Sequence, residues 1–310
     1  MVMPNFFIIG AQKAGTTSLY HYLKQHPQVY MSPRKEPFFF DHELNVNGEV
    51  VKETFGGPGA PPLKFANIRE YQTLFRGVWS EKAIGEASVS YIYAPGTAQR
   101  IKRYVPGARL IALLRNPADR AYSAFLHAVR IGREPLTDFA QALQEEEDRI
   151  RDNWHYVFHY RTRGFYYPQL ERYYELFGRE RVGVWLYEDL RDDPVGVVQS
   201  VFRFLGVDDT FVPDTSSKHN PARIPKNEAA RLMIKVMNKT LPVVSKVFPP
   251  APIVRQRVNG RILRQRVNSR ILTESSPIDP EIRGELIDSY REDILKLQEL
   301  IGRDLSMWLQ

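Results

Sequence analysis

A lysine and three hydroxylated residues lie close together near the start of the 310-residue sequence. Lys13 comes two residues before Gly15, and Thr16, Thr17 and Ser18 follow that glycine directly. An apolar stretch precedes the group and a helical pattern follows it. Backbone N–H groups at the start of a helix, together with a nearby ammonium group, form a site for phosphate. The spacing therefore predicts a phosphate-binding loop.

This loop differs from the loop that binds nucleoside triphosphates. In that motif the lysine follows the second glycine, and the next hydroxyl group holds Mg²⁺. Here Gly10 and Gly15 keep the four-residue gap, but Lys13 lies inside it, and a later apolar strand ends in Arg115 rather than in a metal-binding aspartate. The pattern favours a ligand that is held by cations without a metal. The alternative is an ordinary strand-to-helix turn with Thr16 as its cap.

Two further residues could hold a second phosphate. The planar guanidinium group of Arg115 matches the geometry of phosphate. Ser123 lies eight residues further on, about two turns into the following helical pattern, where its hydroxyl could face the same cavity. The alternative for Arg115 is a surface ion pair with Asp119.

A candidate general base lies between two basic residues and an aromatic run. Glu36 follows Arg34 and Lys35 and precedes three phenylalanines and Asp41. A carboxylate beside apolar rings is partly desolvated, which strengthens it as a base toward a hydroxyl group. The alternative is an exposed glutamate paired with Arg34 or Lys35.

The elements that must position these residues alternate between strands and helices. Buried strands are expected at 6–9, 29–31, 83–85, 109–114 and 182–187, and helical patterns follow them, for example at 16–25 and 194–205. This alternation predicts an α/β fold of three layers, with a central parallel sheet flanked by helices. Ligands bind at the carboxyl ends of such strands, where residues 10–18, Arg115 and Glu188 would lie. The Gly- and Pro-rich segment 45–66 is expected to be a surface loop.

The last third of the chain has no further apolar strand pattern and consists of polar and helical segments. A polar loop over 216–227 contains Lys218, a helical pattern at 228–247 is interrupted by Pro242, and a clean amphipathic helix is expected at 281–300. We expect one domain over 1–310, with a nucleotide-binding α/β core at 1–215 and a loop and helical extension at 216–310.

Most of the net charge of +7 lies in one segment, because residues 251–272 contain six arginines and no acidic residue. This argues against a protein that coats nucleic acid and for focused anionic sites. The arginines belong to a tandem nonapeptide at 255–263 and 264–272. A helix over 253–272 could contact a membrane surface or an anionic partner; the alternative is a solvated basic helix packed on the core.

Several absences limit the function further. Without cysteine, disulfides and thiolate metal sites are excluded. His155 and His159 have helical spacing for two metal ligands but no adjacent carboxylate, so a packed aromatic region is favoured over a metal site. No apolar run approaches 18 residues and no signal peptide is recognisable, so a cytoplasmic location is expected.

Four segments together resemble one enzyme family. The stretches FFIIGAQKAGTTSL, LIALLRNPADRAYSAFLHAV, VWLYEDLRDDP and YREDILKLQELIGRDLSMW are similar to sulfotransferases, in the branch that includes heparan sulfate sulfotransferases and bacterial relatives. The resemblance implies a P-loop-like fold, 3′-phosphoadenosine 5′-phosphosulfate (PAPS) as donor, PAP as product and no metal.

The resemblance also implies roles for the residues above. The backbone of Lys13, Ala14, Gly15, Thr16, Thr17 and Ser18 would hold the 5′-phosphosulfate, and Lys13 would neutralise charge on the leaving phosphate. Arg115 and Ser123 would hold the 3′-phosphate, Lys218 would close over the nucleotide, and Glu36 would be the base.

Two departures bear on the acceptor. Ala87 stands where many heparan-type enzymes have a lysine, and Phe38 replaces a histidine that is common there, which suggests a less charged acceptor. A glycan, a glycolipid or a secondary-metabolite hydroxyl stays open, and so does an amine. The competing hypotheses are a nucleotide-dependent phosphotransferase and a catalytically silent protein that binds nucleotides or anionic glycans.

Overall fold

The computed structural model describes residues 2–55, 57–60, 62–216, 223–225, 230, 272–274 and 276–310. Lys218, the helical pattern at 228–247 apart from residue 230, and the arginine repeat up to residue 271 lie outside these described residues. The roles expected of them therefore stay predictions.

A five-stranded sheet forms the centre of the molecule, in the order β2-β5-β1-β6-β7, and every neighbouring pair is parallel. The strands are β1 (Phe6–Gly10), β2 (Val29–Met31), β5 (Ala83–Ala87), β6 (Arg109–Leu114) and β7 (Val182–Leu186). All five residues of β1 are buried, as a continuous apolar run in a sheet covered on both faces requires. The expected parallel sheet is confirmed.

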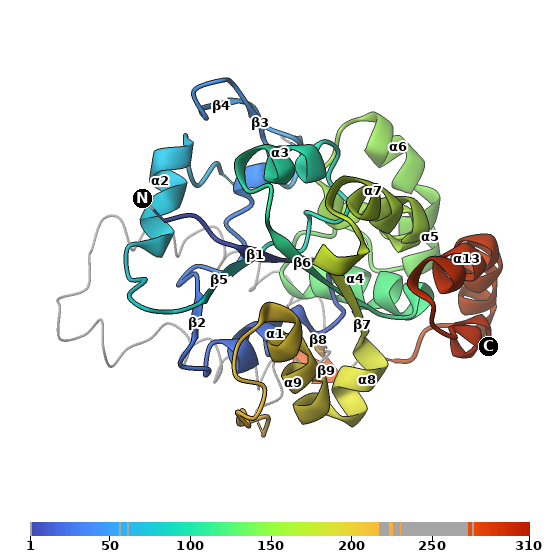
Figure 1. Cartoon of the computed structure of the whole chain (residues 1–310). Coiled ribbons are helices and arrows are strands. Elements are labelled where there is room, and N and C mark those ends of the chain that lie inside the picture. The colour runs from blue at the N-terminus through green and yellow to red at the C-terminus, as the bar shows by residue number, and fades with distance from the viewer. Residues whose placement is uncertain are drawn as a thin grey trace.

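Helices cover both faces of this sheet (Figure 1). On one face α1 (Thr16–Leu23) packs against α9 (Pro194–Leu205), and on the other α3 (Thr97–Tyr104) packs against α7 (Tyr167–Phe177). The chain leaves β1 toward β2 and β5 on one side and later fills β6 and β7 on the other. This change of direction at β1 opens a crevice at the carboxyl ends of the strands, where α/β proteins bind ligands. The remaining shorter helices include α2 (Ile68–Gln72), α5 (Phe139–Gln144), α6 (Glu146–Arg151) and α8 (Tyr187–Asp192).

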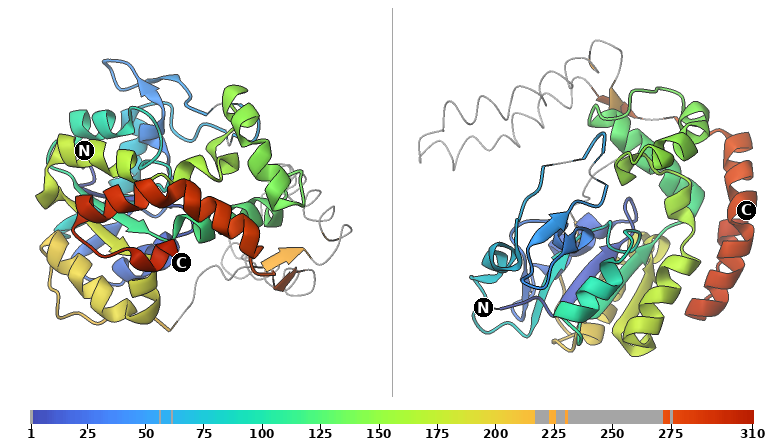
Figure 2. Two further views of the ribbon diagram at one scale, coloured as in Figure 1. Left: turned by 90° about the vertical axis from the view of Figure 1, so that its right-hand side faces the viewer. Right: turned by 90° about the horizontal axis from the view of Figure 1, so that it is seen from above.

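The C-terminal helix α13 (Pro280–Ile301) lies along one side of the molecule and packs against α7 and α4 (Pro117–Arg130) (Figure 2). Its Asp293 carboxylate accepts the backbone N–H of Tyr166 at 2.8 Å. After the helix, the carbonyl of Trp308 accepts a hydrogen bond from the side chain of Asn116 at 3.2 Å. The end of the chain thus supports the loop at the end of β6.

The segment expected to be a surface loop at 45–66 contains a strand, so that prediction is partly wrong. The strand β4 (Val50–Lys52) pairs in antiparallel fashion with β3 (Glu43–Leu44). Asn45 makes the turn, because its Oδ1 accepts the N–H groups of Asn47 and Glu49 at 2.9 and 3.0 Å, and Gly48 takes a φ of +76°. The Gly- and Pro-rich stretch that dominated the sequence pattern begins only after this hairpin.

No helix in the described part of the chain combines the length and the apolar character needed to cross a membrane. The short β8 (Arg223–Pro225) and β9 (Leu272–Glu274) pair with each other, and β8 lies against α4.

Candidate active site

The predicted phosphate loop connects β1 to α1. Gly15 has a φ of +91°, and a side chain there would approach Leu190 at 3.1 Å, so both conformation and space require glycine. Among the described residues no side chain caps α1, which leaves the N–H groups of its first turn for a ligand. Ala14 already donates its N–H to the carbonyl of Ala11 at 3.2 Å. Within the described part of the chain, the N–H groups of Lys13, Gly15 and residues 16–18 donate to no other protein group.

Lys13 lies at the centre of a group of cations. Burial, together with the positive charges of Arg130, Arg115 and Lys35, lowers the pKa of Lys13 to about 8. Lys13 also takes a left-handed φ of +71°, which a lysine adopts only where its surroundings impose it. The excess of positive charge beside an uncapped helix start fits a ligand with more than one phosphate or sulfate group.

Arg115 lies at the carboxyl end of β6, as predicted, and its guanidinium group reaches the loop. Its Nη1 donates to the carbonyl of Lys13 at 3.3 Å, and the group lies 4.8 Å from the ring centre of Tyr187. The alternative ion pair with Asp119 is absent among the described contacts, because Asp119 pairs with Arg283 at 3.2 Å. Arg115 therefore keeps donors for an anionic ligand.

Ser123 lies on α4 and is half-buried. His127 and Arg130 follow it at intervals of four and seven residues, which places the three side chains on one face of the helix. Both interact electrostatically with Lys13, so this face is directed toward the loop. The Nδ1 atom of His127 accepts a hydrogen bond from Arg130 at 3.0 Å. Arg130 and His127 were missed in the sequence, although their spacing from Ser123 was a usable signal.

Glu36 is held against the end of β5 by its backbone. Its N–H donates to the carbonyl of Ala87 at 2.8 Å, and its φ is +60°. Two residues further on, the N–H of Phe38 donates to the hydroxyl of Ser88 at 3.1 Å. These bonds fix a left-handed backbone that the chain would not adopt unsupported. The base loop is thereby tied to the strand next to β1.

The carboxylate of Glu36 pairs with Lys35 at 2.8 Å and keeps 36% of its side-chain surface exposed. The desolvation that the sequence suggested is thus partial, and the ion pair that was its alternative is present. Glu36 also interacts electrostatically with Lys13, so the two residues expected to act in the chemistry lie close enough to influence each other.

A cation missed in the sequence lies beside the base loop. The ammonium group of Lys64 donates a hydrogen bond to the carbonyl of Glu36 and lies 4.2 Å from the ring centre of Phe38. Burial lowers the pKa of Lys64 to about 8. It comes from a segment 28 residues away from Glu36, and no local pattern marked it.

A buried carboxylate supports the base loop that carries Glu36. Glu86 is inaccessible to solvent and accepts hydrogen bonds from Tyr91, Ser88 and Tyr71 at 2.7, 2.8 and 3.1 Å. Burial raises the pKa of Glu86 to about 7. Because Ser88 donates to Glu86 and accepts from the backbone of the base loop, it links the buried acid to the conformation of Glu36.

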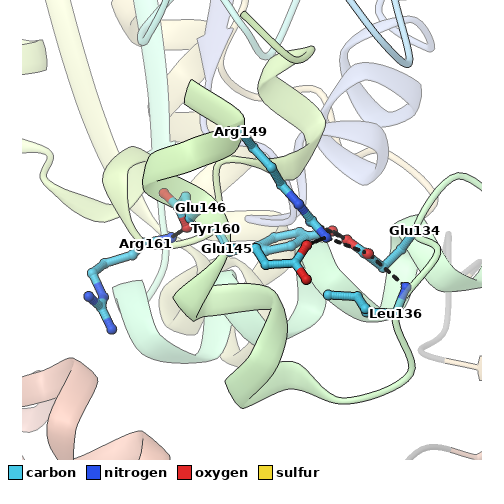
Figure 3. A network of polar contacts seen from close by, with 7 residues as sticks. All are labelled: Glu134, Leu136, Glu145, Glu146, Arg149, Tyr160 and Arg161. Carbon is cyan, nitrogen blue, oxygen red and sulfur yellow. Dashed lines mark hydrogen bonds and ion pairs between the residues drawn. The ribbon is translucent and has the colours of Figure 1, made fainter. Parts of the chain in front are cut away.

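A second polar network holds the segment 149–161 (Figure 3). Arg149 contacts both oxygens of Glu134, at 2.8 and 3.1 Å, and one oxygen of Glu145 at 2.9 Å. Tyr160 donates to Glu134 at 2.5 Å, and Glu146 accepts the N–H of Arg161 at 2.6 Å. The network fixes both ends of the segment 149–161.

His155 and His159 lie inside that segment and are buried, at 5% and 3% exposure. Only a short 3₁₀ turn, Tyr156–Phe158, lies between them, so the helical face considered for them does not form. His159 contacts the hydroxyl of Tyr93 at 2.9 Å and the carbonyl of Trp154 at 3.1 Å, which engages both ring nitrogens. Within the described residues, no three His, Cys, Asp or Glu side chains are grouped as metal ligands.

Known proteins with a similar sequence and fold are sulfotransferases. A family model described as a sulfotransferase domain matches residues 98–234. The crystal structure of a sulfotransferase from Alicyclobacillus acidocaldarius is 36% identical and covers all of both chains, with a TM-score of 0.73.

The matches to curated relatives cover a smaller share of this chain. The membrane-associated sulfotransferase kil1 of Dictyostelium discoideum is 32% identical over 155 residues, which are 48% of this chain and 29% of that protein. A mouse (Mus musculus) bifunctional heparan sulfate N-deacetylase/N-sulfotransferase 4 is 27% identical over 223 residues, 66% of this chain and 22% of that protein. The chain thus spans less than a third of the length of these curated relatives.

Proposed function

The chain belongs to the sulfotransferase family, whose donor is PAPS, and from this premise we propose that Lys13 and Glu36 carry out sulfuryl transfer to an acceptor hydroxyl group. The observation that carries the proposal is the convergence of Lys13, Arg115, Lys35 and Arg130 beside the uncapped start of α1. Such a site matches a donor with phosphates at two positions.

In the proposed reaction, Glu36 accepts the proton of the acceptor hydroxyl group while the oxygen of that hydroxyl group forms a bond to sulfur. The bond between sulfur and the bridging oxygen breaks, and the electron pair stays on the 5′-phosphate of PAP. Lys13 stabilises the charge that develops on this oxygen. Positioning and cations supply most of the catalysis, as in phosphoryl transfer through a loose in-line transition state.

Arg115 and Ser123 are proposed to hold the 3′-phosphate. The free donors of Arg115 at the end of β6 and the position of Ser123 on the face of α4 that carries His127 and Arg130 support this assignment. The open amides of residues 16–18 are proposed to bind the 5′-phosphosulfate.

Lys35 acquires a second role in this arrangement. It pairs with Glu36 and also contributes to the positive potential at Lys13. A bound sulfuryl group competes with Glu36 for the ammonium group of Lys35. We therefore propose that donor binding weakens the ion pair and leaves the carboxylate able to accept a proton.

The test uses Glu36→Gln, which keeps the size of the side chain and removes its basicity. We expect PAP to bind within about twofold of the wild-type affinity and turnover of labelled PAPS with a host extract to fall by roughly 10²–10⁴. Glu43→Gln, in the exposed hairpin, is the matched control and should keep full turnover. Normal activity of Glu36→Gln would show that another group is the base. Donor binding without sulfated product in wild type would instead favour the silent binding protein.

A further inference from the structure

The base loop over 36–41 is held by two hydroxyl groups of the segment that follows β5. The N–H of Phe38 donates to the hydroxyl of Ser88 at 3.1 Å. The N–H of Phe40 donates to the hydroxyl of Tyr91 at 3.2 Å. The path of the loop after the proposed base thus depends on two side-chain oxygens that come from a segment about 50 residues away in sequence.

Glu86 determines how both hydroxyl groups are oriented. A carboxylate can only accept hydrogen bonds, and each hydroxyl group has a single hydrogen atom. Ser88 donates its hydrogen to one oxygen of Glu86, and Tyr91 donates its hydrogen to the other. Because both hydrogens point toward Glu86, lone pairs of the two hydroxyl oxygens are left for the N–H groups of Phe38 and Phe40. The carboxylate thus turns two hydroxyl groups into acceptors for the base loop.

Glu86 is too deeply buried to be the base itself. It is inaccessible to solvent, and both of its oxygens accept hydrogen bonds. In the described part of the chain, three hydroxyl groups and no lysine or arginine contact these oxygens. Burying a carboxylate without a cation is costly. An apolar side chain of similar size would avoid that cost but would orient no hydroxyl group.

The loop that these bonds hold has a strained backbone. Glu36 and Phe38 have φ of +60° and +61°, which residues other than glycine rarely adopt. Such conformations persist only where the surrounding bonds impose them. If the N–H of Phe38 loses its acceptor, we expect the loop to relax and the carboxylate of Glu36 to move with it. Misplacing a reacting group by about 1 Å can lower turnover by about 10²-fold.

We propose that Glu86 is a positioning residue for sulfuryl transfer, which acts through two hydroxyl groups to hold the proposed base Glu36 in its reactive geometry. This inference rests on the proposed function, because it takes Glu36 as the base. Since Glu86 is inaccessible to solvent and touches no substrate, its loss should lower kcat and leave the KM for PAPS unchanged. A residue that served folding alone would change the amount of folded protein and not the kcat of the molecules that stay folded.

The test combines turnover with hydrogen exchange of the full chain. Glu86→Gln keeps the size of the side chain, but its amide group donates to one hydroxyl group instead of accepting from it. We expect kcat with labelled PAPS and a host extract to fall by about tenfold or more, and the KM for PAPS to stay within about twofold of wild type. Exchange of the backbone N–H groups in peptides that cover 36–41 should become about tenfold faster, while peptides from β1 and β6 keep their wild-type rates.

Two tyrosines provide a matched comparison. Tyr71 and Tyr91 are both 0% exposed and both donate to Glu86, and Tyr91 in addition accepts an N–H of the base loop. Tyr91→Phe should lower kcat by about tenfold and speed exchange at 36–41, whereas Tyr71→Phe should keep both within about threefold of wild type. Ser88→Ala should behave like Tyr91→Phe. If circular dichroism shows that Glu86→Gln does not fold, these three variants test the proposal in its place.

The outcomes separate this role from the proposed function. If Glu86→Gln keeps wild-type kcat, or if the two tyrosine variants behave alike, the positioning role is overturned while the proposed function stands. The same holds if exchange at 36–41 is unchanged, or if the KM for PAPS rises as kcat falls, because Glu86 would then act elsewhere than on the base loop. Normal turnover of Glu36→Gln would instead contradict the proposed function, and the role of Glu86 in transfer would fail with it.

Discussion

Arg163 donates from Nη1 to the side-chain oxygen of Gln12 across 2.5 Å, although 151 residues separate the two in sequence. Gln12 precedes Lys13 in the phosphate loop. Arg163 is 3% exposed and has no carboxylate within ion-pair distance in the described part of the chain. Its guanidinium group instead lies 4.7 Å from the ring centre of Tyr156. A buried charge without a counterion is costly, and an anion in the loop offsets that cost.

Replacing Arg163 should therefore affect the donor-bound protein more than the free one. For Arg163→Met we expect turnover to fall by about 10² and the thermal stabilisation by saturating PAP to decrease, because a preorganised positive charge behind the loop is lost. Arg163→Lys keeps the charge and should recover part of both. Steady-state kinetics and thermal melts with and without PAP measure the effects. Wild-type values for both would show that Arg163 serves only the packing of the rings around it.

The pH dependence of donor capture should report Lys13. Because the pKa of Lys13 in the free protein is lowered to about 8, the side chain is charged below that pH and becomes neutral above it. We expect kcat/KM for PAPS to fall as pH rises through about 8. The descending limb of kcat should lie at higher pH, since bound phosphate raises the pKa of Lys13. In Lys13→Arg the limb of kcat/KM should move above pH 10. If the descending limb of kcat/KM stays at the same pH in Lys13→Arg, the titration belongs to a group other than Lys13.

Arg115→Ala should lose donor affinity. A hydrogen bond between charged groups contributes about 1.5–3 kcal/mol, so PAP binding should weaken by roughly 10–100-fold. Arg115→Lys should recover only part of it, because a lysine cannot form the planar fork. Asp119→Ala removes the partner of Arg283 and is the matched control, with wild-type PAP affinity expected. Calorimetric titration with PAP distinguishes the three.

The ion pair between Glu134 and Arg149 should contribute to stability rather than to donor binding. Their side chains are 0% and 3% exposed, and removing one partner leaves a buried charge. We expect Glu134→Gln and Arg149→Met to lower the free energy of unfolding by about 3–5 kcal/mol in urea titrations. Arg151→Ala, which breaks an exposed pair with Asp148, should cost less than about 1 kcal/mol. A small effect at Glu134 would mean that Glu145 or water compensates the charge of Arg149 in place of the Glu134 carboxylate.

The local patterns predicted the sheet well. Apolar runs predicted β2 and β6, and a helical pattern predicted α9, with the boundaries that the structure has; the glycine spacing marked the turn between β1 and α1. These features depend on neighbours within a few residues. The same holds for Arg115 and Glu36, whose positions follow from the ends of β6 and β2.

The contacts that shape the site were not predictable in this way. Lys64 reaches the Glu36 carbonyl and Arg163 reaches Gln12 only because the tertiary fold brings remote segments together. The β3–β4 hairpin was hidden for a different reason, since two short, mostly exposed strands have no apolar alternation. The ion pair between Asp119 and Arg283 of α13 could not be predicted from the sequence of α4 alone.

The attachment of the base loop to β5 has a consequence for how new specificities could arise. Glu36 is bonded to the end of β5, and Lys13 follows the neighbouring β1, so the spacing of two adjacent strands sets the separation of their backbones. Phe55 and Tyr156, which line a cavity beside the base loop, belong to connections outside that sheet. Exchanging those connections would therefore leave the backbone spacing of Lys13 and Glu36 unchanged. The fold thus separates the strands that space these two residues from the connections that surround them.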